Sequence, residues 1–213
     1  MNNGRARDLT AERFDRWAPN YDDSALQPAY RAAHQAVLRA ARRLPNQPGR
    51  VLDVGCGSGR LLRAASTTFP DSLLIGVDIS AGMLAIADPA GANPADPSSA
   101  LPRFLRAAAE GLPFRDGVFD LVLSTMSLRH WRHIDIGLSE IERVLAPAGW
   151  VVLAEVVTAR RPGILTRATR RLAPPPALIA TEMSAAHLVV RHTEPVPGFG
   201  PIMEITLVVA QRR

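Results

Sequence analysis

The chain has 213 residues, 47% of them hydrophobic, which is enough for one buried core and short for two. It contains no run of about 18 apolar residues, and its N-terminus shows no apolar signal core, so we expect a cytoplasmic protein without a membrane span. The only cysteine, Cys56, excludes an internal disulfide and a cysteine cluster for zinc, and no metal is expected.

The formal net charge of +5 raises the possibility of nucleic-acid binding. All of the basic residues are arginines, and they are scattered along helical segments instead of forming one patch. Such a distribution is typical of solvated helix faces. We therefore expect a small-molecule substrate, no nucleic-acid partner, and a monomer or homodimer.

Short apolar strands alternate with helical segments along the chain. An amphipathic stripe marks a helix over residues 25–44, and Pro45, Pro48 and Gly49 end it. Strands are expected at 51–54, 73–78, 104–105, 118–125, 150–157, 188–192 and 202–211. Further helices are expected at 60–69, 81–87, 134–145, 164–172 and 177–186. Residues 88–102 read as a surface loop, and residues 147–149 as the turn before strand 150–157.

This alternation predicts an α/β fold of the Rossmann-like, doubly wound kind. We expect a mostly parallel seven-stranded sheet that is closed by an antiparallel C-terminal hairpin. Residues 1–213 form a single domain in this interpretation. Residues 1–48 are its N-terminal helical cover, and residues 158–187 are a helical cap.

The first strand runs into a glycine-rich turn that has two possible ligands. Gly55, Gly57 and Gly59 follow Asp53, and their backbone N–H groups are expected to face the ligand. A dinucleotide fold requires G-x-G-x-x-G, but here the spacing is G-x-G-x-G, and the negative charge of Asp53 opposes a pyrophosphate. The ammonium and sulfonium groups of S-adenosylmethionine suit this carboxylate better, since it can accept from the ammonium directly or through water.

A second carboxylate stands at the end of the second strand. Asp78 lies where a carboxylate can accept hydrogen bonds from both hydroxyls of a ribose, as in dinucleotide-binding folds. Ser80 follows it as a candidate N-cap of the next helix. Alone, such an aspartate is weak evidence, because it can equally cap a helix. Together with the glycine turn it predicts a nucleoside-containing cofactor.

Four ordered motifs carry a family resemblance: VLDVGCGSG, GVDISAGML, AEGLPFRDGVFDLVLST and IERVLAPAGW. With the N-terminal FDRWAPNYDD, they resemble the class I S-adenosylmethionine-dependent methyltransferases, in the branch that contains the ubiquinone and menaquinone biosynthesis enzymes. The resemblance covers about residues 12–157. It implies methyl transfer from S-adenosylmethionine to a small molecule.

The same resemblance implies the cofactor-binding residues. They are Asp53, Gly55, Cys56, Gly57, Gly59, Asp78, Ile79, Met83, Ala109, Glu110, Ser124 and Thr125. One position departs from the family pattern: Ala108 stands where an aspartate usually accepts from the adenine amino group. The loss of this acceptor is expected to weaken binding by about 1 kcal/mol, roughly tenfold.

Candidates for catalysis are few. His130 lies where the family carries an active-site lip, so it is a candidate base or a packed loop residue. Tyr21 resembles the segment that covers the cofactor, and it also suits a hydrophobic staple. His133 and His187 are weaker candidates. The apolar content of the expected cap, residues 164–186, favours an apolar or aromatic acceptor.

Two alternatives stay open. The first is a nucleic-acid methyltransferase, although the end of the fourth strand, Ser124-Thr125-Met126-Ser127, lacks the Asn/Asp-Pro-Pro-aromatic sequence of enzymes that methylate nucleic-acid amino groups. The second is a non-catalytic methyltransferase-like partner protein, which only Ala108 supports.

Overall fold

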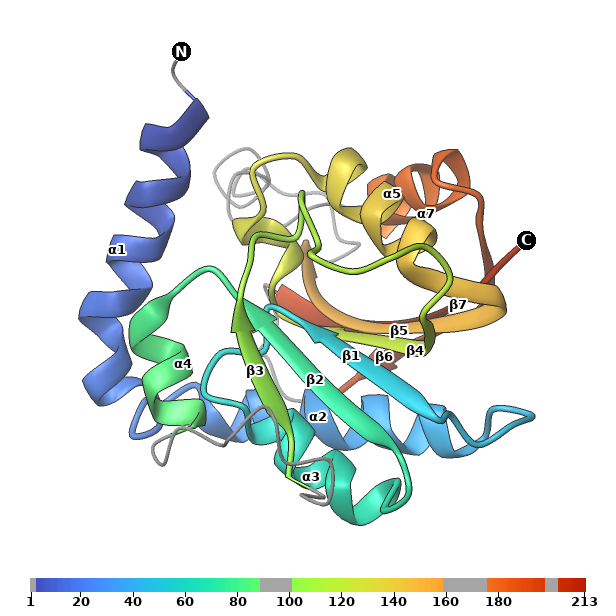
Figure 1. Ribbon diagram of the computed structural model, residues 1–213, viewed down its shortest axis with the longest axis horizontal. Coiled ribbons are helices and arrows are strands. Elements are labelled where there is room, and N and C mark those ends of the chain that lie inside the picture. Colours follow the sequence, from blue (N-terminus) through green and yellow to red (C-terminus); the bar gives the residue numbers. More distant parts are fainter. Residues whose placement is uncertain (1–2, 89–100, 159–175, 198–202) are drawn as a thin grey trace.

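The computed structural model describes residues 3–88, 101–158, 176–197 and 203–213. These residues form one seven-stranded sheet with the order β3-β2-β1-β4-β5-β7-β6 (Figure 1). The strands are β1 (Arg50–Val54), β2 (Leu73–Asp78), β3 (Arg103–Arg106), β4 (Phe119–Thr125), β5 (Leu145–Thr158), β6 (Leu188–Val196) and β7 (Met203–Arg212). The helices are α1 (Asn3–Tyr21), α2 (Gln27–Arg42), α3 (Arg60–Thr68), α4 (Ala81–Ala87), η1 (Leu128–His130), α5 (Ile134–Val144) and α7 (Pro176–Ala185).

Pairing within the sheet confirms the predicted α/β fold class. The first five strands pair in parallel, and β7 lies antiparallel between β5 and β6. Chain order reverses between β1 and β4, which is the topological switch point where ligands of such sheets bind. Several strands therefore bring their carboxyl ends together at this point.

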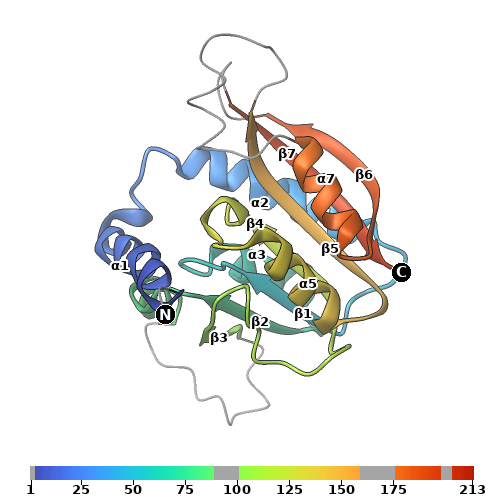
Figure 2. The same cartoon turned by 90° about the horizontal axis from the view of Figure 1, so that it is seen from above.

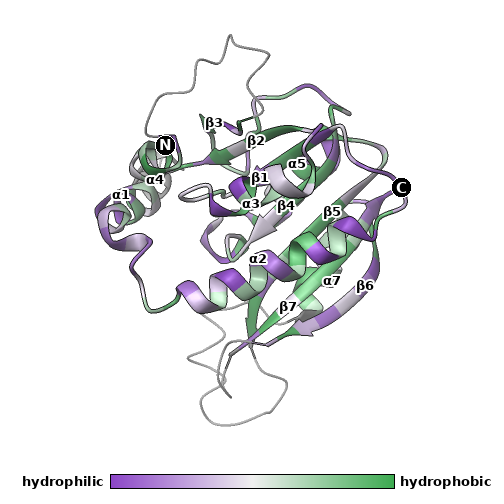
Figure 3. Ribbon diagram, turned by 90° about the horizontal axis from the view of Figure 1, so that it is seen from below, coloured by the Kyte–Doolittle hydropathy of each residue, from purple (hydrophilic) through white to green (hydrophobic). Residues whose placement is uncertain are grey.

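Helices cover both faces of the sheet. In Figure 1, α2 and α3 lie below it and α5 and α7 lie above it. The inner face of α2 is built from small and apolar side chains such as Ala33 and Val37, both fully buried, and Figure 3 shows hydrophilic and hydrophobic residues alternating along this helix. On the other face, Leu138, Ile141 and Met183 pack into the second half of the core. Burial on both faces explains the nearly continuous apolar sequence of β4 and β5.

The N-terminal helix α1 does not pack on the sheet. It lies against α4 and stands on the side of the molecule opposite β6 and α7 (Figure 2). Its sequence is mostly polar, with exposed positions such as Leu9 and Arg13, so its apolar stripe is narrow, and within the expected helical cover of residues 1–48 only the helix over 25–44 is predicted. None of the helices in the described ranges is long and apolar enough to cross a membrane.

β5 begins earlier than the sequence predicts. β5 begins at Leu145, so the expected turn at residues 147–149 lies inside this strand as an irregularity, where Ala148 has a φ of 60°. The expected helix at 164–172 lies outside the described residues, as do residues 89–100 of the expected surface loop.

Candidate cofactor and acceptor pocket

A pocket opens at the carboxyl ends of β1, β2, β3 and β4, with α1, α2 and η1 completing its wall. Ten of the predicted site residues line it. They are Tyr21, Gly55, Gly57, Asp78, Ile79, Met83, Ala109, Glu110, Thr125 and His130. The other four are Asp53, Cys56, Gly59 and Ser124, and the structure places them behind the wall.

Two glycines of the turn are required by close contacts. Gly55 has a φ of 76°, and a Cβ on it would lie 2.3 Å from the Oγ atom of Ser127. Gly59 has a φ of 75°, and its Cβ would lie 2.7 Å from the ring of Phe104. At both positions the backbone is left-handed and a neighbouring side chain occupies the space that a Cβ would need, which only glycine tolerates. Gly55 therefore lets β4 approach the turn, while Gly59 seats α3 on the sheet.

Cys56 lies inside the turn, but its side chain points away from the pocket. The thiol is buried in the core below the sheet, near Gly76. Burial raises the pKa of this thiol, so it stays neutral. Cys56 supports the turn from behind and is not placed to contact a ligand through its side chain.

The expectation that the N–H groups of the turn face a ligand is wrong. The N–H groups of Gly55 and Cys56 both donate to the carbonyl of Val77, at 2.8 and 3.0 Å. That of Gly57 donates to Asp78 at 2.8 Å, and that of Gly59 donates to the carbonyl of Cys56 at 3.0 Å. Residues of the parallel strand β2 accept three of these four hydrogen bonds, and the fourth is made within the turn, which a sequence motif cannot reveal. A pyrophosphate would therefore find few donors here.

Asp53 is a buried carboxylate without a partner. It is 1% exposed, and neither of its oxygens has a hydrogen-bond partner among the described residues. Burial, together with repulsion from Asp78, raises the pKa of Asp53 to about 8. Near pH 7 this group is therefore mostly protonated, and a nearby cation would favour its ionised form. The residues present therefore fit an ammonium group at this end of the pocket.

Replacing Asp53 tests this environment through its pH dependence. A folded-state pKa above the unfolded value means that the folded protein loses stability as the pH rises from about 4 to 8. We expect Asp53→Asn to raise the free energy of unfolding at pH 8 by about 1–3 kcal/mol and to have little effect near pH 4. Urea unfolding at both values measures this. A pH-independent difference between the variant and the native chain would contradict the assigned environment.

Asp78 closes β2 and faces the pocket. Its Oδ2 accepts from the N–H of Gly57 at 2.8 Å, and its Oδ1 accepts from the N–H of Ser80 at 2.9 Å. Each oxygen retains a lone pair for a further donor. Burial raises the pKa of Asp78 against the opposing backbone hydrogen bonds. This geometry fits the two hydroxyls of a ribose.

Residues 107–110 form the wall beside β3. Ala107, Ala108 and Ala109 line the pocket with methyl groups. Glu110 is turned toward the loop after η1, where its Oε1 accepts from the N–H groups of Arg132 and His133 at 2.6 and 3.1 Å. Glu110 thus positions the opposite rim of the pocket.

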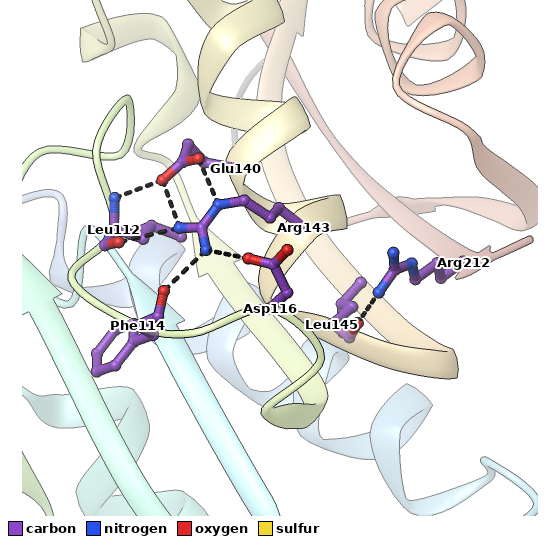
Figure 4. Close-up of polar contacts among 7 residues, drawn as sticks. All are labelled: Leu112, Phe114, Asp116, Glu140, Arg143, Leu145 and Arg212. Carbon is purple, nitrogen blue, oxygen red and sulfur yellow. Dashed lines mark hydrogen bonds and ion pairs between the residues drawn. The ribbon is translucent and has the colours of Figure 1, made fainter.

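An arginine of α5 fixes the chain that continues this wall. Arg143 donates to the carbonyl oxygens of Leu112 and Phe114, at 3.0 and 2.8 Å, and to the carboxylates of Asp116 and Glu140 (Figure 4). Glu140 in turn accepts from the N–H of Leu112 at 2.8 Å. Arg143 lies in the IERVLAPAGW motif, and these hydrogen bonds explain what the arginine of that motif does in the fold.

Ala108 leaves an apolar wall where the family pattern has an acceptor. We expect Ala108→Asp to tighten the binding of S-adenosylhomocysteine about tenfold, because one hydrogen bond to an amino group contributes about 1 kcal/mol. Isothermal titration calorimetry measures the change. Ala108→Asn, which also presents a carbonyl oxygen, is the control for charge. Unchanged or weaker binding by both variants would show that this wall does not face the adenine.

The end of β4 is held by polar groups that sequence reasoning missed in part. Ser124 is fully buried, and its hydroxyl donates to the carbonyl of Val54 at 2.8 Å. Glu155 of β5 is also fully buried and accepts from the N–H groups of Ser127 and Leu128 at 2.6 and 2.9 Å. Burial raises the pKa of Glu155 to about 7. Glu155 is an acidic residue inside the apolar run of β5, and this was the signal in the sequence that could have indicated its role.

Helix α1 is tied over the pocket by two aspartates that the sequence did not reveal. Asp15 accepts from the hydroxyl of Ser80 at 2.5 Å and from the N–H of Gly82 at 2.8 Å, at the start of α4. Asp22 accepts from the hydroxyl of Ser58 and from Arg60, both at 2.8 Å, at the glycine turn. These hydrogen bonds therefore fix α1 both at the start of α4 and at the glycine turn.

Aromatic side chains of α1 face the pocket. The Tyr21 ring lies 4.9 Å from that of Trp17 and stacks at 5.6 Å on that of Tyr30. The hydroxyl of Tyr21 would lie 3.8 Å from a Cβ on Gly57. Burial raises the pKa of Tyr21 far above its ordinary value, so its hydroxyl stays protonated. Tyr21 is placed to cover a bound ligand and to offer a hydrogen bond.

His130 lies on the pocket wall between two arginines. Its Nδ1 is 3.3 Å from Arg13 and its Nε2 is 3.0 Å from Arg129. Burial and the two positive charges lower the pKa of His130 to about 3. His130 is therefore neutral near pH 7 but is a weak base, which disfavours its predicted role in proton abstraction.

The weaker candidates lie elsewhere. His133 is exposed before α5, and His187 is exposed at the turn between α7 and β6. Residues 177–185 of the expected cap belong to α7, which packs against α5 and β6 and does not line the pocket. In the described part of the chain, no group of three His, Cys, Asp or Glu side chains is arranged to hold a metal ion.

Comparison with known proteins agrees with this geometry. Residues 52–153 match the family model described as "Methyltransferase domain". The malonyl-acyl-carrier-protein O-methyltransferase of Dechloromonas aromatica is 32% identical over 145 residues, which cover 67% of this chain and 48% of the relative. The demethylmenaquinone methyltransferase of Thermus thermophilus is 37% identical over 125 residues, covering 56% and 55%. The chain thus spans about half the length of these curated relatives.

Among solved structures, the cyclase SpnF superposes with a TM-score of 0.70 at 21% identity, covering 84% of this chain and 79% of that one. This similarity concerns the fold alone, and the cyclase shows that the fold does not fix the reaction. The family match spans the glycine turn, Asp78 and the end of β4. With the strand order described above, it makes this chain a member of the class I S-adenosylmethionine-dependent methyltransferases.

Proposed function

We propose that the protein transfers a methyl group from S-adenosylmethionine to a small apolar or aromatic molecule. The observation that carries this proposal is the pair of acidic side chains at the turn, because a cation bound beside them would favour the ionised form of Asp53, whose pKa is otherwise raised to about 8. Asp53 is buried behind the turn and Asp78 lines the pocket, close enough for each to affect the other's charge, while four of the turn's N–H groups are already bonded within the protein. This arrangement favours a cationic nucleoside over a dinucleotide.

The residues present suggest how the cofactor is held. Asp53 faces the ammonium group, directly or through water, and Asp78 accepts from the ribose hydroxyls. Ile79 and Met83 supply the apolar wall beside the adenine, and Ala108 contributes no acceptor there. Ser124 and Glu155 fix the end of β4 beneath the reacting centre.

S-adenosylmethionine, when bound, supplies an electrophilic methyl group whose leaving group is a neutral thioether. The protein then has mainly to orient the acceptor in line and to exclude water. Phe14, Tyr21 and Trp131 provide an apolar surface for this purpose. His130 is too weak a base for the protein to depend on it. An acceptor that is already ionised, or that needs no deprotonation, fits this pocket.

The acceptor, the location and the oligomeric state of the protein are part of the same proposal. The curated relatives are named for the methylation of malonyl-acyl-carrier protein and demethylmenaquinone, and we propose a metabolite acceptor and no nucleic acid. The buried free thiol of Cys56 agrees with the expected cytoplasmic location. We propose a monomer or homodimer.

The test is a search for one labelled product. The protein is incubated with methyl-labelled S-adenosylmethionine and a metabolite extract, and mass spectrometry follows the label. We expect a low-molecular-weight product that disappears with Asp78→Asn. Label in nucleic acid only, or no enzyme-dependent label despite demonstrated cofactor binding, would contradict the proposed function.

A further inference from the structure

Tyr30 of α2 is the most deeply buried aromatic side chain of the pocket wall. It is 6% exposed, whereas the rings of Phe14, Tyr21, His130 and Trp131 are half-buried. The ring of Tyr30 stacks on that of Tyr21, with the ring centres 5.6 Å apart and the planes 18° apart. The hydroxyl of Tyr30 is therefore a polar group that is held in place in a mostly aromatic wall.

The start of α2 is tied to the end of α1, which sets the position of Tyr30 relative to Tyr21. The side-chain amide of Gln27, which is itself buried, donates to the carbonyl of Tyr21 at 2.8 Å. The N–H of Tyr30 donates to the carbonyl of Leu26 at 3.1 Å. The two phenol rings are therefore positioned by their backbones as well as by their own contact.

Tyr21 stands between Tyr30 and the glycine turn. The ring of Tyr21 is the neighbour that a Cβ on Gly57 would meet, and burial, with Tyr30 and Asp78 nearby, raises the pKa of its hydroxyl. Burial also raises the pKa of Tyr30, but the charge of Arg129, on η1, opposes this rise. The hydroxyl of Tyr30 therefore faces the side of the pocket that the cofactor leaves for a second ligand.

The hydrogen-bonding neighbours of the Tyr30 hydroxyl are the hydroxyl of Tyr21 and the guanidinium of Arg129. A guanidinium can only donate, and each tyrosine hydroxyl carries one proton and two lone pairs. Whichever tyrosine donates to the other, one hydroxyl proton has no acceptor within this group of three. In the described part of the chain, no carbonyl or carboxylate oxygen accepts from either hydroxyl.

The proton that is left over belongs to Tyr30. Burial raises the pKa of both hydroxyls, and the hydrogen bond between them adds to the rise for Tyr21 and opposes it for Tyr30. A hydrogen bond has this effect when Tyr21 donates and Tyr30 accepts, because it then favours the charged form of the acceptor. The hydroxyl of Tyr30 is thus a donor that lines the pocket and lacks an acceptor in the protein.

We propose that Tyr30 donates a hydrogen bond to an oxygen atom of the acceptor, so that the substrate carries a carbonyl or hydroxyl oxygen beside its apolar or aromatic part. The proposal rests on the function proposed above and names the group by which the same site recognises its substrate. A site built to donate a hydrogen bond rejects a ligand that lacks the accepting atom, because the donor then stays unpaired. Tyr30 is a specificity-determining residue in this role.

Pairs of ligands that differ by one oxygen test this proposal. 1-Tetralone and 2-naphthol are titrated into the full chain saturated with S-adenosylhomocysteine, and tetralin and naphthalene serve as the matching hydrocarbons. We expect at least one oxygen compound to bind tenfold or more tightly than its hydrocarbon. Tyr30→Phe keeps the stacked ring, so it should abolish this preference while the affinity for S-adenosylhomocysteine changes less than twofold.

Tyr21→Phe is the matched control, because it removes the other hydroxyl of the pair and leaves the proton of Tyr30 free. The preference for the oxygen compound should survive in this variant. A preference that survives Tyr30→Phe, or that is lost in Tyr21→Phe, would overturn the proposal, as would equal binding of both pairs by the native chain.

The same titration separates this proposal from the proposed function. Failure of S-adenosylhomocysteine to bind the native chain would count against the proposed function. Loss of S-adenosylhomocysteine binding in Tyr30→Phe alone would place this hydroxyl on the cofactor, which would overturn its assignment to the acceptor and leave the proposed function intact.

Discussion

Asp78→Asn is expected to weaken the binding of S-adenosylhomocysteine about a hundredfold, which corresponds to about 2.7 kcal/mol. The carboxylate offers two free lone pairs to the pocket while it holds the N–H groups of Gly57 and Ser80. An amide retains only one acceptor oxygen, so it loses a ribose contact and also places an NH₂ group against one backbone donor. Calorimetric titration of the folded variant measures the effect.

A carboxylate with the same local role supplies the control. Asp120 also accepts from two backbone N–H groups, those of Gly49 and Arg50, both at 2.9 Å. This contact lies at the amino ends of β1 and β4, away from the pocket. Asp120→Asn should change the affinity for S-adenosylhomocysteine less than twofold. Equal losses in both variants would mean that the effect is structural and that Asp78 does not contact the ligand.

Gly55→Ala is expected to lower the free energy of unfolding by about 2–4 kcal/mol and to remove cofactor binding. The added Cβ would lie 2.3 Å from Ser127 Oγ and 2.5 Å from Ser127 Cβ, on a backbone with a φ of 76°. Ser127 cannot move aside easily, because its N–H donates to Glu155 at 2.6 Å and its hydroxyl accepts from Trp131 at 2.7 Å. Urea unfolding measures the loss.

Two further variants separate clash from backbone strain. Gly111→Ala meets nothing within 4 Å and should change stability by less than about 0.5 kcal/mol. Combining Gly55→Ala with Ser127→Gly removes the clash but keeps the strained backbone. Gly55→Ala should therefore cost less stability in the Ser127→Gly background than it costs in the native chain. Unfolding of Gly55→Ala indistinguishable from the native chain would contradict the close approach of β4 to the turn.

The parts of the site that could be predicted are local in sequence. The turn with Gly55 and Gly57 and the strand-end position of Asp78 follow from short motifs, because a strand and the turn after it are encoded by adjacent residues. The sheet was predictable for the same reason, since each buried strand is a continuous apolar run. The antiparallel C-terminal hairpin was predictable because two segments of alternating pattern are joined by a loop rich in Pro and Gly.

What was missed depends on contacts between distant residues. Asp15 meets Ser80 across 65 positions, and Asp22 meets Ser58 across 36. These bonds hold α1, whose polar sequence gives little sign of a helix. The donors of the turn were misjudged because Val77, on a different strand, accepts two of them. Tertiary pairing of this kind leaves no periodic signal in the sequence.

The central claim is that the turn after β1 receives a cationic nucleoside and not a dinucleotide. Thermal unfolding of the native chain with S-adenosylhomocysteine and, separately, with NAD tests it most directly. We predict a stabilisation of about 2.7 kcal/mol by S-adenosylhomocysteine at a hundred times its dissociation constant, and none by NAD at the same concentration. Stabilisation by NAD, with no effect of millimolar S-adenosylhomocysteine, would contradict the account.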